Sequence, residues 1–328
     1  MKKKMGLIGV LLASLAIVSG CGDNSKEGVI TLRMAQASAA DGAIGISMDK
    51  FAKDLSERSN GRIHLLTFHN AQLGSERENI ESVQMGNLDI AVVNQSVLGN
   101  FLPELAVFDL PYTIQSFEHA DRVFLGDIGN GFLQDLSKVR LKGIAFWESG
   151  FRNLTNSKRD VTNANDVAGL RIRVMENKIH QDLWASLGAD PVPMSWSDAY
   201  TGMQQGAIDG QENPATVIDK NNVVEVNKHM AMTEHCYSTV VLVMSQSTYD
   251  AFSPEDRKIF DECIAKASID ERALSRKMDK EAIVNLESKG MTVIYPDKTE
   301  FISKTQLVRD KYGYRYAKLA SDIAALAN

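Results

Sequence analysis

The sequence has little cysteine and lacks the short motifs that mark common enzyme classes. Only three cysteines stand among 328 residues, without a CxxC pair, and the six histidines show no metal-ligand spacing. We therefore predict neither a disulfide scaffold nor a metal site. No GxSxG, P-loop, HExxH or strand-linked GxGxxG motif occurs, so the usual hydrolase, metalloprotease and nucleotide sites are not indicated. We predict no cofactor and no enzymatic activity.

The chain also has no excess of basic residues. It carries 36 Lys and Arg against 42 Asp and Glu, a formal net charge of −6. An acidic chain of this kind is unsuited to general nucleic-acid binding, and any local cluster of arginines becomes more informative. The length suggests about two domains.

Long hydrophobic runs are absent except at the N-terminus. Lys2, Lys3 and Lys4 precede an apolar run of 14 residues, Met5 to Val18, which is short for a membrane span and typical of a signal peptide. "VSGC" follows and resembles a bacterial lipobox, so we predict a signal peptide over residues 1–20 and lipidation of Cys21; an ordinary signal peptide is the alternative. Cys236 and Cys263 could pair after export, but we favour two buried free thiols.

The first part of the mature chain alternates strand and helix patterns. Strands are predicted at 29–37, 63–68 and 88–93, and helices at 45–58 and 75–85, with Ser75 as an N-cap and Gly86 as a stop. This alternation predicts an α/β fold with a largely parallel sheet and helices on both faces. In such sheets, ligands bind at the carboxyl ends of the strands.

The second part continues with further strands and helices. Strands are predicted at 143–150, 170–174 and 237–246, and helices at 178–187 and, with Ser197 as N-cap, up to Gly206; "GADPVPM" between these helices is predicted to be irregular. Ser253 and Pro254 are a strong helix start, and the next Gly or Pro is Gly290. One unbroken helix here would be about 54 Å long, so it either breaks or lies across two lobes.

Several polar side chains stand where a binding site would need them. Arg171 and Arg173 alternate with apolar residues in "LRIRV", so they share one face of a strand. Arg152 follows another strand, and Arg suits carboxylates because its planar fork makes two parallel hydrogen bonds. On pattern alone a solvated face is the favoured explanation of these arginines, and Trp196 is more often a core residue than a ligand contact. His235 and Cys236 are neighbours in a strand, so they point to opposite faces and do not form a catalytic pair.

Six motifs in order resemble one protein family: "LGSERENIESVQMGNLDIAVV", "FDLPY", "FRNLTNSKR", "GLRIRV", "GADPVPMSWSDAY" and "GAIDGQENP". Together they resemble the substrate-binding proteins of tripartite ATP-independent periplasmic (TRAP) transporters, over nearly the whole mature chain. The resemblance implies a two-lobed periplasmic-binding-protein fold with a ligand cleft between the lobes and a long helix bridging them. We predict residues 27–149 plus 239–278 for lobe I and 150–238 plus 279–328 for lobe II.

The resemblance also implies a set of ligand contacts. The family's carboxylate-binding arginine matches Arg173, not Arg171, which we place at the rim or surface. Its second arginine matches Arg152, its asparagine matches Asn213, and its aromatic residue matches Trp196. Weaker matches are Asn94 and Glu176. Gln36 is a substitute where this chain departs from the family near the first strand end.

What the protein binds and where it acts follow as expectations. We predict a monomeric, exported, lipid-anchored periplasmic protein that delivers a small carboxylate to the small and large membrane subunits of a TRAP transporter. The side chains favour a sugar acid such as a uronate or aldonate, with a C4-dicarboxylate as the alternative. The different-class alternatives are an exported enzyme acting on acidic sugars and a structural or adhesive lipoprotein.

Overall fold

The fold is built on one sheet that runs through the whole molecule. The computed structural model describes residues 28–327, so the predicted signal peptide and Cys21 lie outside the described residues. Within that range nine strands pair in the order β2-β1-β3-β8-β4-β7-β5-β6, and β9 pairs with β8. The strands are β1 (Ile30–Ala35), β2 (Ile63–Phe68), β3 (Ile90–Asn94), β4 (Leu141–Asn156), β5 (Arg171–Val174), β6 (Asp190–Pro193), β7 (Gly210–Asn213), β8 (His229–Ser245) and β9 (Thr292–Ile294).

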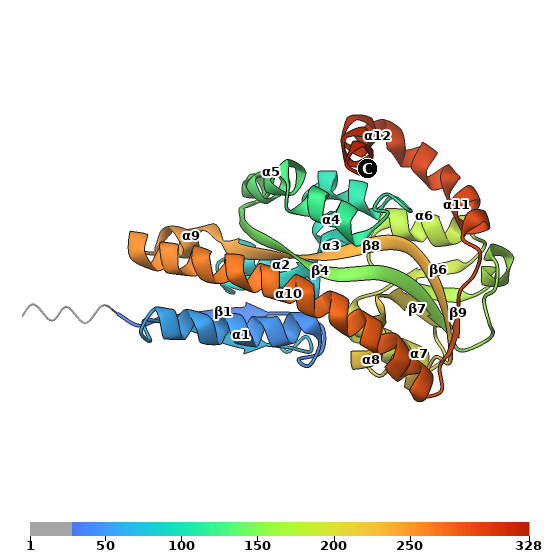
Figure 1. Cartoon of the computed structure of the whole chain (residues 1–328), viewed down its shortest axis with the longest axis horizontal. Coiled ribbons are helices and arrows are strands. Elements are labelled where there is room, and N and C mark those ends of the chain that lie inside the picture. Colours follow the sequence, from blue (N-terminus) through green and yellow to red (C-terminus); the bar gives the residue numbers. More distant parts are fainter. Residues whose placement is uncertain (1–27, 328) are drawn as a thin grey trace, which may run out of the picture.

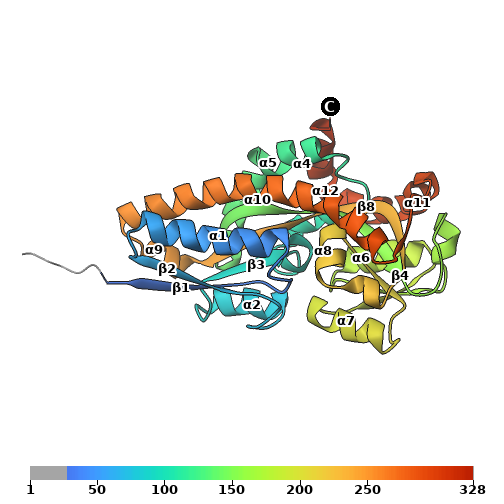
Figure 2. The same cartoon turned by 60° about the horizontal axis from the view of Figure 1, so that its bottom comes forward.

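Helices cover both faces of this sheet (Figures 1 and 2). They are α1 (Ala43–Arg58), α2 (Glu76–Gln84), α3 (Gln95–Leu98), α4 (Phe117–Phe124), α5 (Asp127–Asp135), α6 (Lys178–Ser186), α7 (Trp196–Gln204), α8 (Ala215–Lys220), α9 (Gln246–Asp250), α10 (Pro254–Ser288), α11 (Thr299–Lys304) and α12 (Gln306–Ala325). Short 3-10 turns, η1 (Pro103–Asp109) to η4 (Val223–Glu225), complete the chain. None of the helices in residues 28–327 is both long and apolar enough to cross a bilayer.

The first half forms as its local sequence predicts. β1, β2 and β3 pair in parallel, and α1 and α2 connect them. The hydroxyl of Ser75 accepts a hydrogen bond from the backbone N–H of Glu78, and the Glu78 carboxylate accepts one from the backbone N–H of Ser75. These two bonds form a capping box that starts α2. Met48, Phe51 and Leu55 share one face of α1 and are buried in a cluster with β1 and β2. Helical and strand periodicity in the sequence therefore predicted these three strands and two helices.

The centre of the sheet is antiparallel, which corrects the prediction of a largely parallel sheet. β4 and β8 have 16 and 17 residues, pair antiparallel along their length, and extend through both halves. β3 pairs antiparallel with β8, and β7 pairs antiparallel with β4. The long strands β4 and β8 cross between the halves in opposite directions. Parallel pairing is therefore confined, in each half, to the strands away from this central pair. The β4–β8 ladder has an irregularity between Glu148 and Gly150, where Gly150 has φ +116°.

Two local predictions in the second half were wrong. Asp190–Pro193, in the segment predicted to be irregular, is the edge strand β6, which pairs in parallel with β5. Prolines are tolerated there because an edge strand leaves one side of its backbone unpaired. The N-cap of α7 is Ser195, not Ser197, so Trp196 opens the helix.

The long helix α10 is unbroken. The sequence allowed either a break or a continuous helix across two lobes, and the structure shows the continuous helix. Its 35 residues correspond to about 52 Å at ~1.5 Å per residue. It contacts α1 in the first half, β4 in the centre and α8 in the second half (Figures 1 and 2). The other C-terminal helix, α12, contacts η1 as well as α6, so it touches elements of both halves. The lobe boundaries stay a prediction.

Both described cysteines are free thiols buried in the interior. Cys236 lies in β8 and Cys263 in α10. This confirms the prediction of two small buried side chains rather than a disulfide.

Candidate functional site

A cleft lies where the carboxyl ends of parallel strands from the two halves meet. Asn94 ends β3 and Asn213 ends β7, while Ala37 and Met175 follow β1 and β5 within two residues. All four line a cavity of about 420 Å³, part of which is open to solvent. Its other lining residues are Ser38, Ile44, Glu76, Ser149, Arg152, Arg173, Trp196, Val217 and Val240. The location is the one expected for ligands in α/β sheets.

Arg173 is the cation of this wall that has no ion-pair partner among the described residues. Its side chain is 3% exposed, yet it forms no ion pair within residues 28–327. Its Nε donates to the carbonyl oxygen of Met194 at 2.9 Å, and its guanidinium lies 5.5 Å from the ring centre of Trp196. These contacts hold the side chain but leave the two terminal nitrogens free of acceptors in the described part of the chain. Burial lowers the pKa of Arg173 to about 10, so the side chain stays charged at neutral pH.

Arg152 is equally buried, but its charge is compensated. Its Nε and one terminal nitrogen donate to the two carboxylate oxygens of Glu212 at 2.5 and 2.9 Å, and both side chains are at most 1% exposed. Burial opposes both charges; the ion pair nevertheless raises the pKa of Arg152 and lowers that of Glu212 far below its usual range. His235 Nε2 lies 2.9 Å from the same carboxylate. Arg152 therefore lines the cleft as one member of a buried ion pair with Glu212.

The remaining predicted wall residues are also brought to the cleft. The Nδ2 of Asn94 donates to Ser238 at 2.7 Å, while its Oδ1 caps α3 by accepting the N–H of Ser96. The Nδ2 of Asn213 donates to Gln211 at 2.6 Å. Trp196 lies half-buried beside Arg173. Internal hydrogen bonds thus fix the orientation of both amides before any ligand arrives.

Two predicted residues do not line the cleft. Glu176 is exposed, and its backbone carbonyl accepts from Asn100. Gln36 is buried and bonds His69 at 2.9 Å. Their assignment as ligand contacts remains a prediction that these positions do not favour. Arg171 lies outside the cleft wall and pairs with Asp209 at 2.7 Å, in agreement with its predicted position at the rim or surface.

Sequence reasoning missed Glu76, the carboxylate in the cleft wall. It opens α2, and its Oε1 accepts the backbone N–H of Asn94 at 2.8 Å. Burial raises its pKa. The available signal was its place directly after the Ser75 N-cap, because residues at a helix start after a strand face the ligand edge of the sheet. Ser38, Ser149 and Val217 were missed as well, and their types carry no comparable signal.

One group of described residues has the donor atoms for a metal ion, but its neighbours already use them. Asp109, His180 and Cys236 are buried with potential ligand atoms within 4.8 Å of one another. The carboxylate of Asp109 accepts from Asn177 at 2.7 Å and from Ser96. Burial raises the pKa of Cys236 well above its usual value, so the thiol stays neutral and is a poor ligand. We interpret Asp109 and His180 as members of a buried hydrogen-bonded network with Ser96 and Asn177.

Comparisons with known proteins agree with this architecture. Residues 34–315 match the family model of the bacterial extracellular solute-binding proteins, family 7. A solute-binding protein of Verminephrobacter eiseniae is 34% identical over 291 residues, 88% of this chain and 87% of that protein. Two crystal structures are similar to this chain over more than 90% of its length and 98% of their own length. A TRAP periplasmic solute-binding protein from Polaromonas sp. JS666 bound to D-erythronate has TM-score 0.85 at 35% identity, with 91% of this chain covered. The sugar acid binding protein of Advenella mimigardefordensis in complex with galactonate has TM-score 0.89 at 27% identity, with 92% covered. The chain therefore belongs to family 7 of the bacterial extracellular solute-binding proteins, the substrate-binding components of TRAP transporters.

Proposed function

We propose that this protein captures a small sugar acid outside the cytoplasm and delivers it to the membrane subunits of a TRAP transporter. The observation that carries the proposal is Arg173, a buried guanidinium in the cleft whose two terminal nitrogens have no acceptor among residues 28–327. A buried charge without a counter-ion is unfavourable, and a ligand carboxylate would compensate it and match its fork with two parallel hydrogen bonds. The family supplies binding components of transporters, so we expect capture without turnover.

The charges around Arg173 support a monocarboxylate that carries hydroxyl groups. Glu212 already compensates Arg152, and Glu76 adds a carboxylate to the wall. A second ligand carboxylate would meet these acids rather than a free cation. Sugar hydroxyls, in contrast, can donate to Glu76 and bond the two amides of Asn94 and Asn213. The bound erythronate and galactonate of the two similar structures agree with this preference.

Trp196 and the closure of the cleft complete the proposed mechanism. Trp196 offers a ring face that can pack on the apolar side of a sugar acid while it stacks on Arg173. The wall takes residues from both halves of the sheet, so a ligand that contacts both favours the closed arrangement. We propose that the predicted lobes, 27–149 plus 239–278 and 150–238 plus 279–328, move as these two units. Glu176 and Gln36 would join the site only through such a movement.

A ligand panel tests this function. Thermal shift and titration calorimetry would compare D-galactonate, D-glucuronate, D-erythronate and succinate, with D-galactose as the matched uncharged control. We expect the sugar acids to bind, succinate to bind more weakly and galactose not to bind. Tighter binding of succinate would favour the C4-dicarboxylate alternative. Conversion of a ligand, detected by mass analysis after incubation, would favour the enzyme, and binding of no acid would refute the proposal.

Export and lipid anchoring are tested separately. We propose that residues 1–20 are removed and that Cys21 carries the lipid, on the basis of the "VSGC" sequence. A strain that expresses the full chain should incorporate a labelled fatty acid and place the protein in the membrane fraction, whereas Cys21→Ala should abolish both effects. The control Cys263→Ala should retain the label. A wild-type protein that is processed but unlabelled would contradict the anchor.

A further inference from the structure

A second pocket opens directly beside the cleft. It has a volume of about 340 Å³, part of which is open to solvent, and shares four lining residues with the cleft: Ser38, Ile44, Ser149 and Val217. Because the two share a wall, a ligand held at Arg173 can extend from one into the other.

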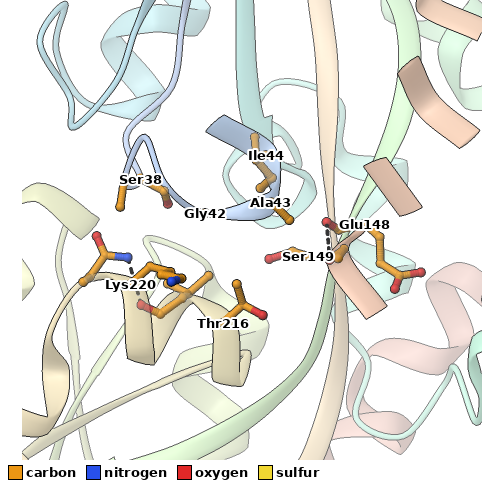
Figure 3. A pocket seen from close by; sticks show the side chains of 12 residues that line it. Ser38, Gly42, Ala43, Ile44, Glu148, Ser149, Thr216 and Lys220 are labelled. Atoms are coloured by element: carbon orange, nitrogen blue, oxygen red, sulfur yellow. Dashed lines mark hydrogen bonds between the residues drawn. The ribbon is translucent and has the colours of Figure 1, made fainter. Parts of the chain in front are cut away.

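Both halves of the fold build this second pocket. Figure 3 shows Ser38 and the start of α1, from Gly42 to Ile44, on one side, and Thr216 and Lys220 of α8 on the other. Ser149, on the crossing strand β4, projects between them, while the carboxylate of Glu148 points away. The ion pair of Lys220 with Asp41, at 3.7 Å, joins the two sides.

Three polar groups of this pocket have no hydrogen-bond partner in the described residues. They are the hydroxyls of Ser38 and Ser149 and the ammonium of Lys220. The carboxylates nearest to the ammonium, Asp41 and Asp219, lie at 3.7 and 3.9 Å, beyond hydrogen-bond distance.

Other polar side chains of the wall are already engaged. Glu148 accepts from Tyr237 and Arg276, and the hydroxyl of Ser275 donates to the Glu148 carbonyl. Thr216 bonds Asp279. Of the three free groups, Ser38 and Ser149 line the cleft as well as the second pocket, whereas the partly exposed Lys220 lines the second pocket alone.

We propose that this pocket is the subsite for the distal hydroxyl groups of the ligand and that Ser149, Ser38 and Lys220 bind them. The inference rests on the proposed function, because it assumes that the ligand carboxylate lies at Arg173. The preferred ligand is then a hydroxylated monoacid longer than four carbons, of the aldonate or uronate type.

A second carboxylate at the distal end is disfavoured by the charges. Lys220 already lies between the carboxylates of Asp41 and Asp219, and Asp219 also pairs with Lys289 at 2.6 Å. The two acids and the two ammonium groups balance, so an incoming carboxylate would find no uncompensated cation here. Hydroxyl groups accept from the ammonium and donate to the acids, so they satisfy both. The subsite therefore selects aldonates over diacids of equal length.

Calorimetry on a series of acids tests the subsite. The probes are D-erythronate, the five-carbon D-ribonate, D-galactonate and the six-carbon diacid galactarate. We expect affinity to rise about tenfold or more from erythronate to galactonate, and galactarate to bind at least tenfold more weakly than galactonate. Equal affinity along the series, or preference for the diacid, would overturn the subsite.

Variants locate the effect in this pocket. Lys220→Gln removes the ammonium, and Ala43→Leu fills space that only the second pocket contains. Each should lower the ratio of galactonate affinity to erythronate affinity by about fivefold to tenfold. Lys289→Gln is the matched control, since Lys289 pairs with Asp219 but lines neither cavity; it should leave the ratio unchanged.

The outcomes separate this inference from the proposed function. If erythronate binds and the variants leave the ratio unchanged, the subsite is wrong and the carboxylate site stands. If none of the acids binds the wild-type protein, both are wrong. Circular dichroism melts of each variant show whether it is folded, and Lys220→Gln, which changes a partly exposed side chain, still decides the question if Ala43→Leu fails to fold.

Discussion

Replacing Arg173 by alanine should remove most of the affinity for the acid and little of the fold. The variant deletes a charged, two-pronged hydrogen-bond donor from a buried position. Truncating one partner of such a pair costs about 2–5 kcal/mol, which corresponds to roughly 30-fold to 4,000-fold weaker binding. Within the protein, only the bond to Met194 and the contact with Trp196 are lost, and an uncompensated buried charge disappears. We therefore expect the free energy of unfolding to change by less than about 2 kcal/mol.

The matched control is Arg171→Ala, two positions earlier on the same strand. Arg171 bonds Asp209 through Nε and a terminal nitrogen at 3.1 and 2.7 Å, but its side chain is 41% exposed. A pair this exposed is worth about 1 kcal/mol or less, so the variant should lose a little stability and no affinity. Titration calorimetry and urea unfolding measure the two quantities separately. Equal affinity of Arg173→Ala and the wild type, or equal losses of affinity in both variants, would refute the assignment of Arg173.

Two further predictions concern buried carboxylates. Glu212→Gln should destabilise the protein by about 3 kcal/mol in urea unfolding at pH 7, because it leaves Arg152 buried without its counter-charge; an effect below 1 kcal/mol would contradict this. Glu271 in α10 is fully buried, and burial raises its pKa from 4.5 to about 8. Its pKa is higher in the folded state than in the unfolded state. Its contribution to the free energy of unfolding is therefore complete below about pH 4.5 and is lost as the pH rises through 8. The pKa difference limits this loss of stability to at most about 5 kcal/mol. Glu271→Gln should therefore flatten the decline of stability between pH 5 and 8. The exposed control Glu287→Gln should match the wild type both in urea unfolding at pH 7 and in the pH profile of stability. A wild-type pH profile for Glu271→Gln would show that this carboxyl is ionised in the fold.

Elements with local signals could be predicted from the sequence. The capping box at Ser75, the Ser253–Pro254 start of α10 and the spacing of Met48, Phe51 and Leu55 act within one or two helical turns. They do not depend on the rest of the chain. β6 was missed because its prolines oppose a strand locally, and only pairing with β5 supplies the hydrogen bonds that make it one.

Candidate site residues divide in the same way. Alternation in "LRIRV" placed Arg171 and Arg173 on one face, and the ordered motifs indicated which of them meets a carboxylate. Neither could show that Asp209 engages Arg171 while Arg173 stays unpaired, since that depends on a residue 38 positions away. Glu176 shows the limit of matching positions: its place after the strand is the expected one, but its side chain is exposed.

The sequence by itself determined the family, the parallel outer parts of the sheet, the start of the long charged helix and five residues of the cleft wall. These follow from periodicity, caps and motifs that lie close together along the chain. Only the tertiary structure decided the balance of charge. Arg152 meets Glu212, 60 positions later, because β4 and β7 pair antiparallel. Lys220 meets Asp41 because the two halves face each other across a pocket. Which buried cation remains free for a ligand is set by contacts between distant residues, and these contacts exist only once the sheet has formed.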